Sequence, residues 1–225
     1  MGTYSTSEHT RQALIFAAGE LVAERGVGQV STRAIAQKAG ENLGAIHYHF
    51  GGKDNLLQEM LRFACRDHTE PSLLGVIQAQ EDRLHAVEGQ VEAVRSLIRH
   101  YMRTVLSPER PRWCSRAIYQ ILQCAGPLRD FLDEQVLNSD FAAIDLLFKH
   151  IRPEWPLQEV RLWVYVVVGP IVFHTDHIET IMLHLDVKTF PKDYLEKLEH
   201  RLTDDALRAL DLPTDVSVSK EERSS

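Results

Sequence analysis

The sequence predicts an all-α protein with two parts, a small N-terminal domain of three helices and a larger helical domain after it. Apolar residues recur at spacings of three and four along most of the 225 residues, as in helices that bury one face. Prolines and glycines separate these segments where helices can begin or end. One β-branched run, at residues 163–173, could form a strand, but no second run could pair with it.

Composition excludes several classes of protein. With 44% apolar and 25% charged residues, the chain resembles folded globular proteins and neither a disordered nor a collagen-like chain. No apolar run reaches the roughly 18–20 residues of a membrane span, and no signal peptide is recognisable. Three cysteines without C-x-x-C spacing argue against a disulfide framework. We therefore expect a cytoplasmic protein with reduced thiols and no membrane association.

Charge is distributed unevenly. The whole chain carries a net charge of −7, yet residues 1–53 hold five basic and four acidic side chains. A surface that contacts phosphate is therefore expected near the N-terminus.

The N-terminal region contains signals for short, well-delimited helices. Apolar periodicity predicts helices over residues 11–25, 32–39 and 43–49, and a fourth that begins near residue 53. Side chains that can cap helix N-termini precede the first three, and glycines follow the same three. The capping residues are Ser7, Ser31 and Asn42, and the glycines are Gly26, Gly40 and Gly51.

Helical periodicity continues beyond residue 69, with apolar stripes at 87–105, 128–147 and 195–210. Residues 163–173 are predicted to form a buried helix with a kink at Gly169-Pro170. The expected domains are therefore residues 1–53 and 54–212, followed by a polar, disordered tail at 213–225.

The segment 31–53 has the layout of a helix-turn-helix, whose second helix enters the major groove of DNA. Ile35 and Ile46 are spaced to pack the two helices together, and Gly40 allows the sharp turn between them. Gly44 and Ala45 are small and would allow close approach to DNA. Free backbone N–H groups at helix N-termini are suited to phosphate.

These residues resemble the N-terminal domain of TetR-type transcriptional regulators. The family pattern extends from about residue 10 to residue 57, in order and without gaps. The run 42–51 is most similar to CecR-type repressors, and a weaker likeness to that subgroup occurs at 126–134.

The resemblance implies particular contacts with DNA. Positions that commonly hold phosphate in the family are occupied by Thr32, Arg33, His47, Tyr48 and Lys53. Positions that face base edges are occupied by Asn42, Leu43 and Ala45. Glu41 departs from the family, which usually has an apolar residue there, and its charge would repel phosphate if it faced DNA. Leu43 could contact a thymine methyl group but could not recognise guanine.

The resemblance also implies a homodimeric repressor that binds a near-palindromic operator and responds to a small molecule. The dimer contact is expected to be a four-helix bundle that uses residues 162–185 and 194–210 of each subunit. Aromatic and amide side chains suited to an effector pocket, or to a plain core, lie in the larger domain. They are Tyr101, Trp113, Tyr119, Gln120, Gln123 and Trp163.

Two alternatives remain open at this point. On a continuous helix, His174, His177 and His184 would share a face beside Asp176 and Glu179, which would suit a metal-sensing regulator. An all-α enzyme or ligand-binding protein could also use the same scaffold. No hydrolase, zinc-protease or phosphate-loop motif is present, so we expect no catalytic residues, bound metal or cofactor.

Overall fold

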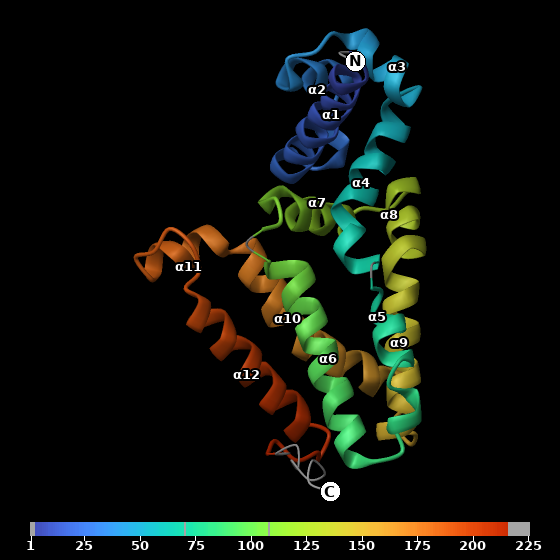
Figure 1. Cartoon of the computed structure of the whole chain (residues 1–225), viewed down its shortest axis with the longest axis vertical. Coiled ribbons are helices and arrows are strands. Elements are labelled where there is room, and N and C mark those ends of the chain that lie inside the picture. Colours follow the sequence, from blue (N-terminus) through green and yellow to red (C-terminus); the bar gives the residue numbers. More distant parts are fainter. Residues whose placement is uncertain (1–2, 70, 108, 216–225) are drawn as a thin grey trace, which may run out of the picture. The chain divides into compact units, whose positions relative to one another are not determined.

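The structure, a computed structural model, describes residues 3–69, 71–107 and 109–215. These residues contain helices and no β-strand, which confirms the predicted all-α class (Figure 1). The chain divides into two compact units, the first made of residues 1–72 and 107–140 and the second of 73–106 and 141–225.

The first unit contains the N-terminal helices and a later pair that packs on them. Its elements are α1 (Thr3–Arg25), the 3-10 turn η1 (Val27–Gln29), α2 (Thr32–Ala39), α3 (Leu43–Phe50), α4 (Lys53–Thr69), α7 (Arg112–Leu122), α8 (Pro127–Leu132) and the π-helical segment η3 (Asp133–Leu137). Helix α1 packs against α2, α4 and α7. Its buried residues, among them Leu14, Ala18 and Val22, share one apolar core with those of its neighbours.

A close contact between α1 and α7 helps to hold this unit together. The ring of Trp113 on α7 lies over Gly19 on α1, where an added Cβ would come within 2.2 Å of Trp113 Cε3. The same ring stacks on Phe63 of α4, with centroids 5.7 Å apart. The indole can pack this closely against α1 only because Gly19 has no side chain.

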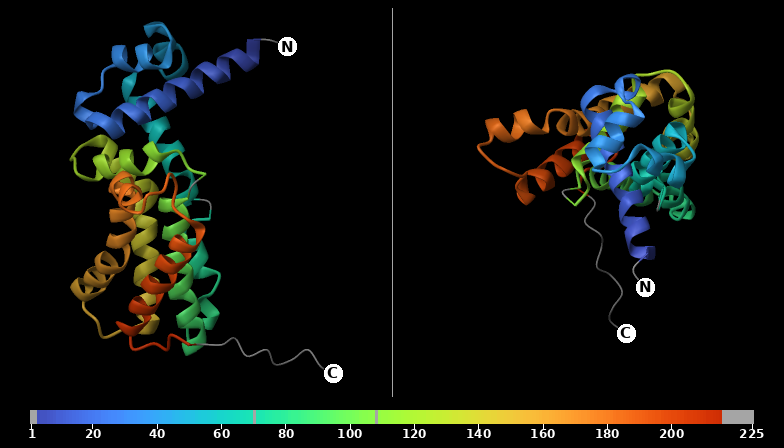
Figure 2. Two further views of the ribbon diagram at one scale, coloured as in Figure 1. Left: turned by 90° about the vertical axis from the view of Figure 1, so that its left-hand side faces the viewer. Right: turned by 90° about the horizontal axis from the view of Figure 1, so that it is seen from above.

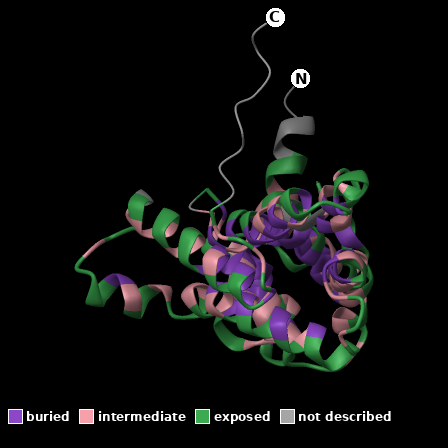
Figure 3. Cartoon of the chain, turned by 90° about the horizontal axis from the view of Figure 1, so that it is seen from below, coloured by how far each residue is buried: buried purple, intermediate pink, exposed green. Residues whose placement is uncertain are grey.

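The second unit is built around α6 (Val87–Leu106). Its other elements are α5 (Leu73–Gln78), η2 (Glu81–Arg83), α9 (Asn138–Ile151, which begins in the first unit), α10 (Leu157–Asp176), α11 (Ile178–His184) and α12 (Lys192–Arg208). Helices α10 and α12 both pack on α6, and α12 runs beside it in Figure 2. The apolar stripes meet in a second core, which is separate from the first, and buried residues lie on the inward faces of the helices (Figure 3).

The predicted helix limits in the N-terminal region are largely confirmed. Helix α2 has the predicted limits, and α3 ends one residue later than expected, at Phe50. The N-cap assigned to Ser7 is wrong, because α1 already begins at Thr3 and includes Ser7. A polar start that favours a cap can also continue a helix when the following turns pack well.

The β-branched segment forms part of α10 and is helical, as predicted. It is not fully buried, however, since Tyr165, Val166 and Phe173 are each more than half exposed, as is Leu162 directly before the segment. Pro170 lies inside the helix, and the sharp change of direction comes later, at His177.

Among the described residues, no single helix combines the length and hydropathy of a membrane span. Helices α10 and α11 reach that criterion only when taken together, and they meet at a bend of 77°.

The compact units do not follow the expected domain limits of 1–53 and 54–212. Helix α4 and the pair α7–α8 pack with the N-terminal helices, so the first unit gains residues from beyond position 53. The expectation that DNA contacts come from residues 1–53 concerns function and stays a prediction. Of the predicted tail at 213–225, residues 216–225 lie outside the described residues.

Candidate nucleic-acid interface

The turn between α2 and α3 is defined by side-chain caps and one left-handed glycine. Ser31 Oγ accepts a hydrogen bond from Ala34 N at 3.1 Å, and Asn42 Oδ1 accepts one from Ala45 N at 3.0 Å. Gly40 has φ 71° and ψ 23°, a conformation that glycine adopts without steric cost. Both caps and the glycine turn were predicted, and the structure confirms them.

Apolar packing fixes the orientation of α3. Ile35 on α2 and Ile46 on α3 are both completely buried, as their predicted role requires. At the C-terminal end of α3, the Asn55 side-chain amide donates to Phe50 O at 2.8 Å. Helix α3 is therefore held between α2 and α4, and its opposite face is left to solvent.

Most predicted DNA-binding residues lie on that outer surface. Tyr48 is 82% exposed and Leu43 is 50% exposed, although both are large and largely apolar. The remaining exposed members of the set are Arg33, Asn42, Gly44 and His47, and Thr32 and Lys53 are half-buried. One short helix and the starts of its neighbours thus present both polar and apolar side chains to solvent.

Ala45 is the exception. It is 9% exposed and belongs to the apolar core of the first unit. The prediction that it faces base edges is not supported by this position, because a methyl group turned inward cannot reach a groove. The sequence showed that Ala45 lies in the first turn of α3, but it did not show whether its side chain faces solvent or the core.

Gly44 is restricted by the cap rather than by the core. A Cβ added there would lie 3.1 Å from Asn42 Oδ1, the atom that caps α3. A larger residue would press on the cap as well as on any DNA that lies against it.

The acidic side chains around the turn are paired with donors on neighbouring helices. Lys38 binds Glu20 at 3.0 Å and Glu24 at 3.2 Å. The hydrogen bonds to Glu20 and Glu24 raise the pKa of Lys38. Glu41 accepts a hydrogen bond from Thr10 Oγ1 at 2.9 Å, which directs its carboxylate toward α1. The departure from the family at Glu41 therefore has a local structural role.

Sequence reasoning missed the residues that connect α1 to this motif. Thr10 binds Glu41, and the Arg11 guanidinium lies 5.6 Å from the centroid of the Phe50 ring while it also donates to Glu59. These contacts join residues 31 to 48 positions apart. No local pattern could reveal them, because they depend on how the helices pack.

The metal-sensing alternative is not supported. The chain bends by 77° between α10 and α11, so His184 does not continue the face that carries His174. His174 is already engaged, with Nδ1 2.6 Å from Pro170 O and Nε2 2.9 Å from Tyr194 Oη. His177 stacks on Phe173 at 4.1 Å. Among the residues that the structure describes, no group of three or more metal-binding side chains occurs.

The six candidate effector residues fall in both units. Tyr101 and Trp163 lie in the core of the second unit, and Trp163 Nε1 donates to Ala206 O at 3.3 Å. The other four lie in the first unit, on α7 or directly after it, and are Trp113, Tyr119, Gln120 and Gln123. Neither unit brings all six together, so the effector site stays a prediction.

The fold and the exposed α3 define a helix-turn-helix protein, and comparison with known proteins agrees. Residues 14–60 match the family model described as bacterial regulatory proteins, tetR family. The HTH-type transcriptional regulator SrpR of Pseudomonas putida is 34% identical over 99 residues, covering 39% of this chain and 46% of SrpR. The match therefore spans less than half of SrpR.

Two further curated relatives and one solved structure extend the comparison. The uncharacterized HTH-type transcriptional regulator TtgW, also of Pseudomonas putida, is 33% identical over 39% of this chain and 72% of TtgW. The HTH-type transcriptional repressor BepR of Brucella suis biovar 1 is 27% identical over 74% of this chain and 80% of BepR. The structure of the fatty acid degradation regulator FadR from Bacillus halodurans has a TM-score of 0.56 at 19% identity, covering 91% and 97% of the two chains.

The chain belongs to the TetR family of transcriptional regulators. The likeness to FadR concerns the fold alone. The narrower resemblance to CecR-type repressors is not tested by these comparisons and stays a prediction.

Proposed function

We propose that this protein is a cytoplasmic repressor of transcription that binds a near-palindromic operator as a homodimer and responds to a small molecule. The observation that carries the proposal is the exposed surface of α3 above the buried Ile46, on a helix that Asn42 caps and Gly40 orients. The name of the relative BepR supports repression rather than activation.

In this proposal, α3 enters the major groove and neighbouring groups bind phosphate. Asn42 and Leu43, at the start of α3, reach base edges, and Leu43 favours a thymine methyl group. The DNA phosphate backbone is contacted by Arg33, Tyr48 and Lys53, together with Thr32 and His47. Because Lys38 is held by two glutamates, Arg33 and Lys53 are the cations best placed to bind phosphate.

Dimerisation is supported by an apolar surface on α10. Leu162, Val166 and Phe173 lie one, two or three turns apart, Tyr165 adjoins Val166, and each of the four is more than half exposed. Gly169 lies on the same face with open space around it. Contiguous exposed apolar surface of this kind marks an interaction site, and a second copy related by a two-fold axis is the partner proposed.

Helix α12, which was also expected to form part of the dimer contact, offers little apolar surface for it. Its apolar residues, among them Leu202, Ala206 and Leu207, belong to the core of their own subunit. The exposed positions of α12 include Asp193, Lys197 and Arg208, which are charged. In the proposed four-helix bundle, α10 therefore supplies the apolar contact and α12 supplies polar contacts.

An effector that favours one arrangement of the two α3 helices would change operator affinity. A coupling free energy of about 1–3 kcal/mol corresponds to roughly 5–150-fold in affinity. The surroundings of Trp113 support its assignment as an effector residue. Its indole N–H is buried with no hydrogen-bond partner among the described residues. A buried donor of this kind gains from an acceptor on a ligand.

The proposal is tested by electrophoretic mobility shift with DNA from upstream of the protein's own gene. We expect a saturable complex containing two subunits, with an affinity that falls as salt concentration rises, because phosphate contacts release counterions. An unrelated duplex of equal length is the control. Equal, weak binding to both duplexes would refute operator recognition and favour a ligand-binding protein or enzyme on this scaffold.

A further inference from the structure

Two neighbouring residues of α1 reach the two ends of α3. Thr10 Oγ1 donates to Glu41 Oε1 at 2.9 Å, and Glu41 lies in the turn that leads into α3. The Arg11 guanidinium lies 5.6 Å from the centroid of the ring of Phe50, the last residue of α3. Successive side chains on a helix diverge by about 100°, so adjacent residues of α1 can contact separate parts of a neighbouring helix.

Glu41 occupies a defined place in the turn. Its backbone N–H donates to Ala36 O at 2.9 Å, and the N–H of Gly40 donates to Gln37 O at 3.2 Å. These two hydrogen bonds form a Schellman motif, in which the residue after the glycine often makes an apolar contact with the preceding helix. At that position Glu41 has a carboxylate, which accepts from Thr10 on α1. The hydrogen bond to α1 therefore replaces the apolar contact that the motif often has.

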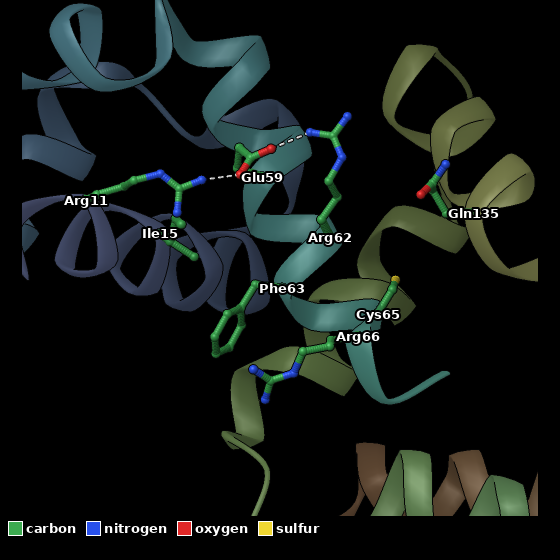
Figure 4. A pocket seen from close by; sticks show the side chains of 8 residues that line it. All are labelled: Arg11, Ile15, Glu59, Arg62, Phe63, Cys65, Arg66 and Gln135. Carbon is green, nitrogen blue, oxygen red and sulfur yellow. Dashed lines mark hydrogen bonds and ion pairs between the residues drawn. The ribbon is translucent and has the colours of Figure 1, made fainter. Parts of the chain in front are cut away.

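Arg11 is held on α4 as well as on α3. Its guanidinium donates to Glu59 of α4, and Glu8, one turn earlier on α1, lies 3.8 Å from Arg11 Nη1. Figure 4 shows the Arg11 side chain extending from α1 to Glu59, in a pocket that Gln135 of η3 also lines. A charged hydrogen bond and an aromatic ring together favour one orientation of a guanidinium. Helix α1 therefore contacts α3 at its end as well as at its start.

Base recognition depends on the orientation of α3 more than phosphate binding does. In the proposed function, Asn42 and Leu43, at the start of α3, reach the base edges. The cations proposed for phosphate, Arg33 and Lys53, lie on α2 and α4. Phosphate contacts place a protein on any duplex, whereas base contacts read the sequence. A change that tilts α3 should therefore reduce operator preference and leave general DNA binding in place.

We propose that Thr10 and Glu41 are positioning residues for operator recognition, because their hydrogen bond fixes the entry into α3. This inference rests on the proposed function. Asn42 directly follows Glu41 and caps α3, so a shift of the turn displaces the first residues that reach the bases. The buried Ile46 holds α3 against the core, but apolar burial is non-directional. A hydrogen bond depends on angle as well as distance and supplies the missing direction.

Fluorescence anisotropy with two duplexes of equal length tests the pair. One duplex is the operator from upstream of the protein's own gene, and the other is an unrelated sequence. Thr10→Val and Glu41→Ala each remove the hydrogen bond, and each should weaken operator binding about tenfold, the order of one misplaced base contact. Binding to the unrelated duplex should change by less than about twofold, and the salt dependence should be unaltered, because no phosphate contact is lost.

Conservative variants separate positioning from other roles. Thr10→Ser keeps the hydroxyl and Glu41→Gln keeps an acceptor oxygen, so both should bind each duplex as the unaltered protein does. The double variant Thr10→Val/Glu41→Ala should lose no more operator affinity than either single variant, because the two residues act through one contact. Thr180→Val, at an exposed threonine on α11, is the matched control and should have no effect. Thermal unfolding of each variant checks its folding.

The possible failures are distinguishable. If the unaltered protein prefers the operator and Thr10→Val and Glu41→Ala keep that preference, this inference alone is wrong. Equal losses on both duplexes would show a general defect in folding or binding and would overturn positioning. Tighter binding of Glu41→Gln to both duplexes would show that the carboxylate acts by repelling phosphate. If the unaltered protein binds both duplexes equally, the proposed function fails, and this inference fails with it.

Discussion

At the scale of single residues, two positions in α3 that were both predicted to face DNA bases differ in burial. Leu43 is half exposed and Ala45 is buried, although both lie in the first turn of the helix. The side chain of the larger residue points to solvent and that of the smaller one to the core. Their substitutions are therefore expected to affect different properties of the protein.

Ala45→Leu should destabilise the folded state by about 1–3 kcal/mol, since added methylene groups overfill a packed core. Leu43→Ala should change stability by no more than about 0.5 kcal/mol, because its side chain has little to pack against. Urea unfolding of both variants measures this. Leu43→Ala should also weaken preference for thymine in the operator, as measured with single-base substitutions. Equal stabilities of the two variants would contradict the burial of Ala45.

Lys53 begins α4 and is proposed to bind phosphate. Lys53→Ala should weaken binding to operator and unrelated DNA alike, and should lower the salt slope by about one for each subunit. Fluorescence anisotropy at several salt concentrations measures both quantities. Lys149→Ala, an exposed lysine on α9, is the control. A loss confined to the operator would show that Lys53 recognises bases instead.

His100 makes stability depend on pH. It is 3% exposed on α6, and burial, aided by the charge of Arg103, lowers the pKa of its imidazole from 6.5 to about 4. Between these values the unfolded chain binds a proton that the folded chain does not, so the free energy of unfolding falls as pH drops from about 6.5 toward 4. Above this window the group has no effect.

Urea unfolding at pH 7, above the window, and at pH 5, within it, measures the effect. His100→Gln should reduce the loss of stability between the two pH values. His200→Gln, at a position 80% exposed on α12, should leave that loss unchanged. The same loss in His100→Gln as in the unaltered protein would mean that other groups cause it.

At the scale of helices, the contact of α7 with α1 depends on the absence of a side chain. Gly19→Ala would place a Cβ within 2.2 Å of Trp113 Cε3, so α7 or the indole must shift. We expect a destabilisation of about 1–3 kcal/mol, as for overfilled cores. Urea unfolding followed by tryptophan fluorescence measures it.

Gly28→Ala, at a position with open space around it, is the control for this substitution. Trp113→Leu in the Gly19→Ala background should recover part of the loss, because contacting residues are energetically coupled. Additive effects of the two changes would show that the close contact is not the cause.

At the scale of the whole molecule, the exposed face of α10 is expected to decide the oligomeric state. Val166 is 64% exposed near the middle of that face. Val166→Glu should convert the proposed dimer to monomers, since a charge buried without a partner in an apolar contact is costly. Light scattering coupled to gel filtration measures the mass, and operator affinity should fall with it.

Glu81→Lys, an exposed charge change on η2, should leave the mass unchanged. A Val166→Glu variant that remains dimeric would place the subunit contact elsewhere. A monomeric variant that binds the operator with unaltered affinity would refute the need for two subunits.

The sequence by itself determined the all-α class, the limits of α2, those of α3 to within one residue, and the capped turn between them. These features depend on contacts between near neighbours, such as Ser31 with Ala34 and Asn42 with Ala45, so a short run of residues specifies them. The ordered TetR pattern lies in the same segment, and for that reason the family could be recognised before the structure.

Only the tertiary structure decided which residues distant in the chain meet. It placed Ala45 in the core, separated the three histidines at a 77° bend, and divided the six candidate effector residues between two units. It also brought Arg11 of α1 and Gln135 of η3 into one pocket with α4. Periodicity tells which face of a helix is apolar, but the partner of that face is set by packing across the whole chain.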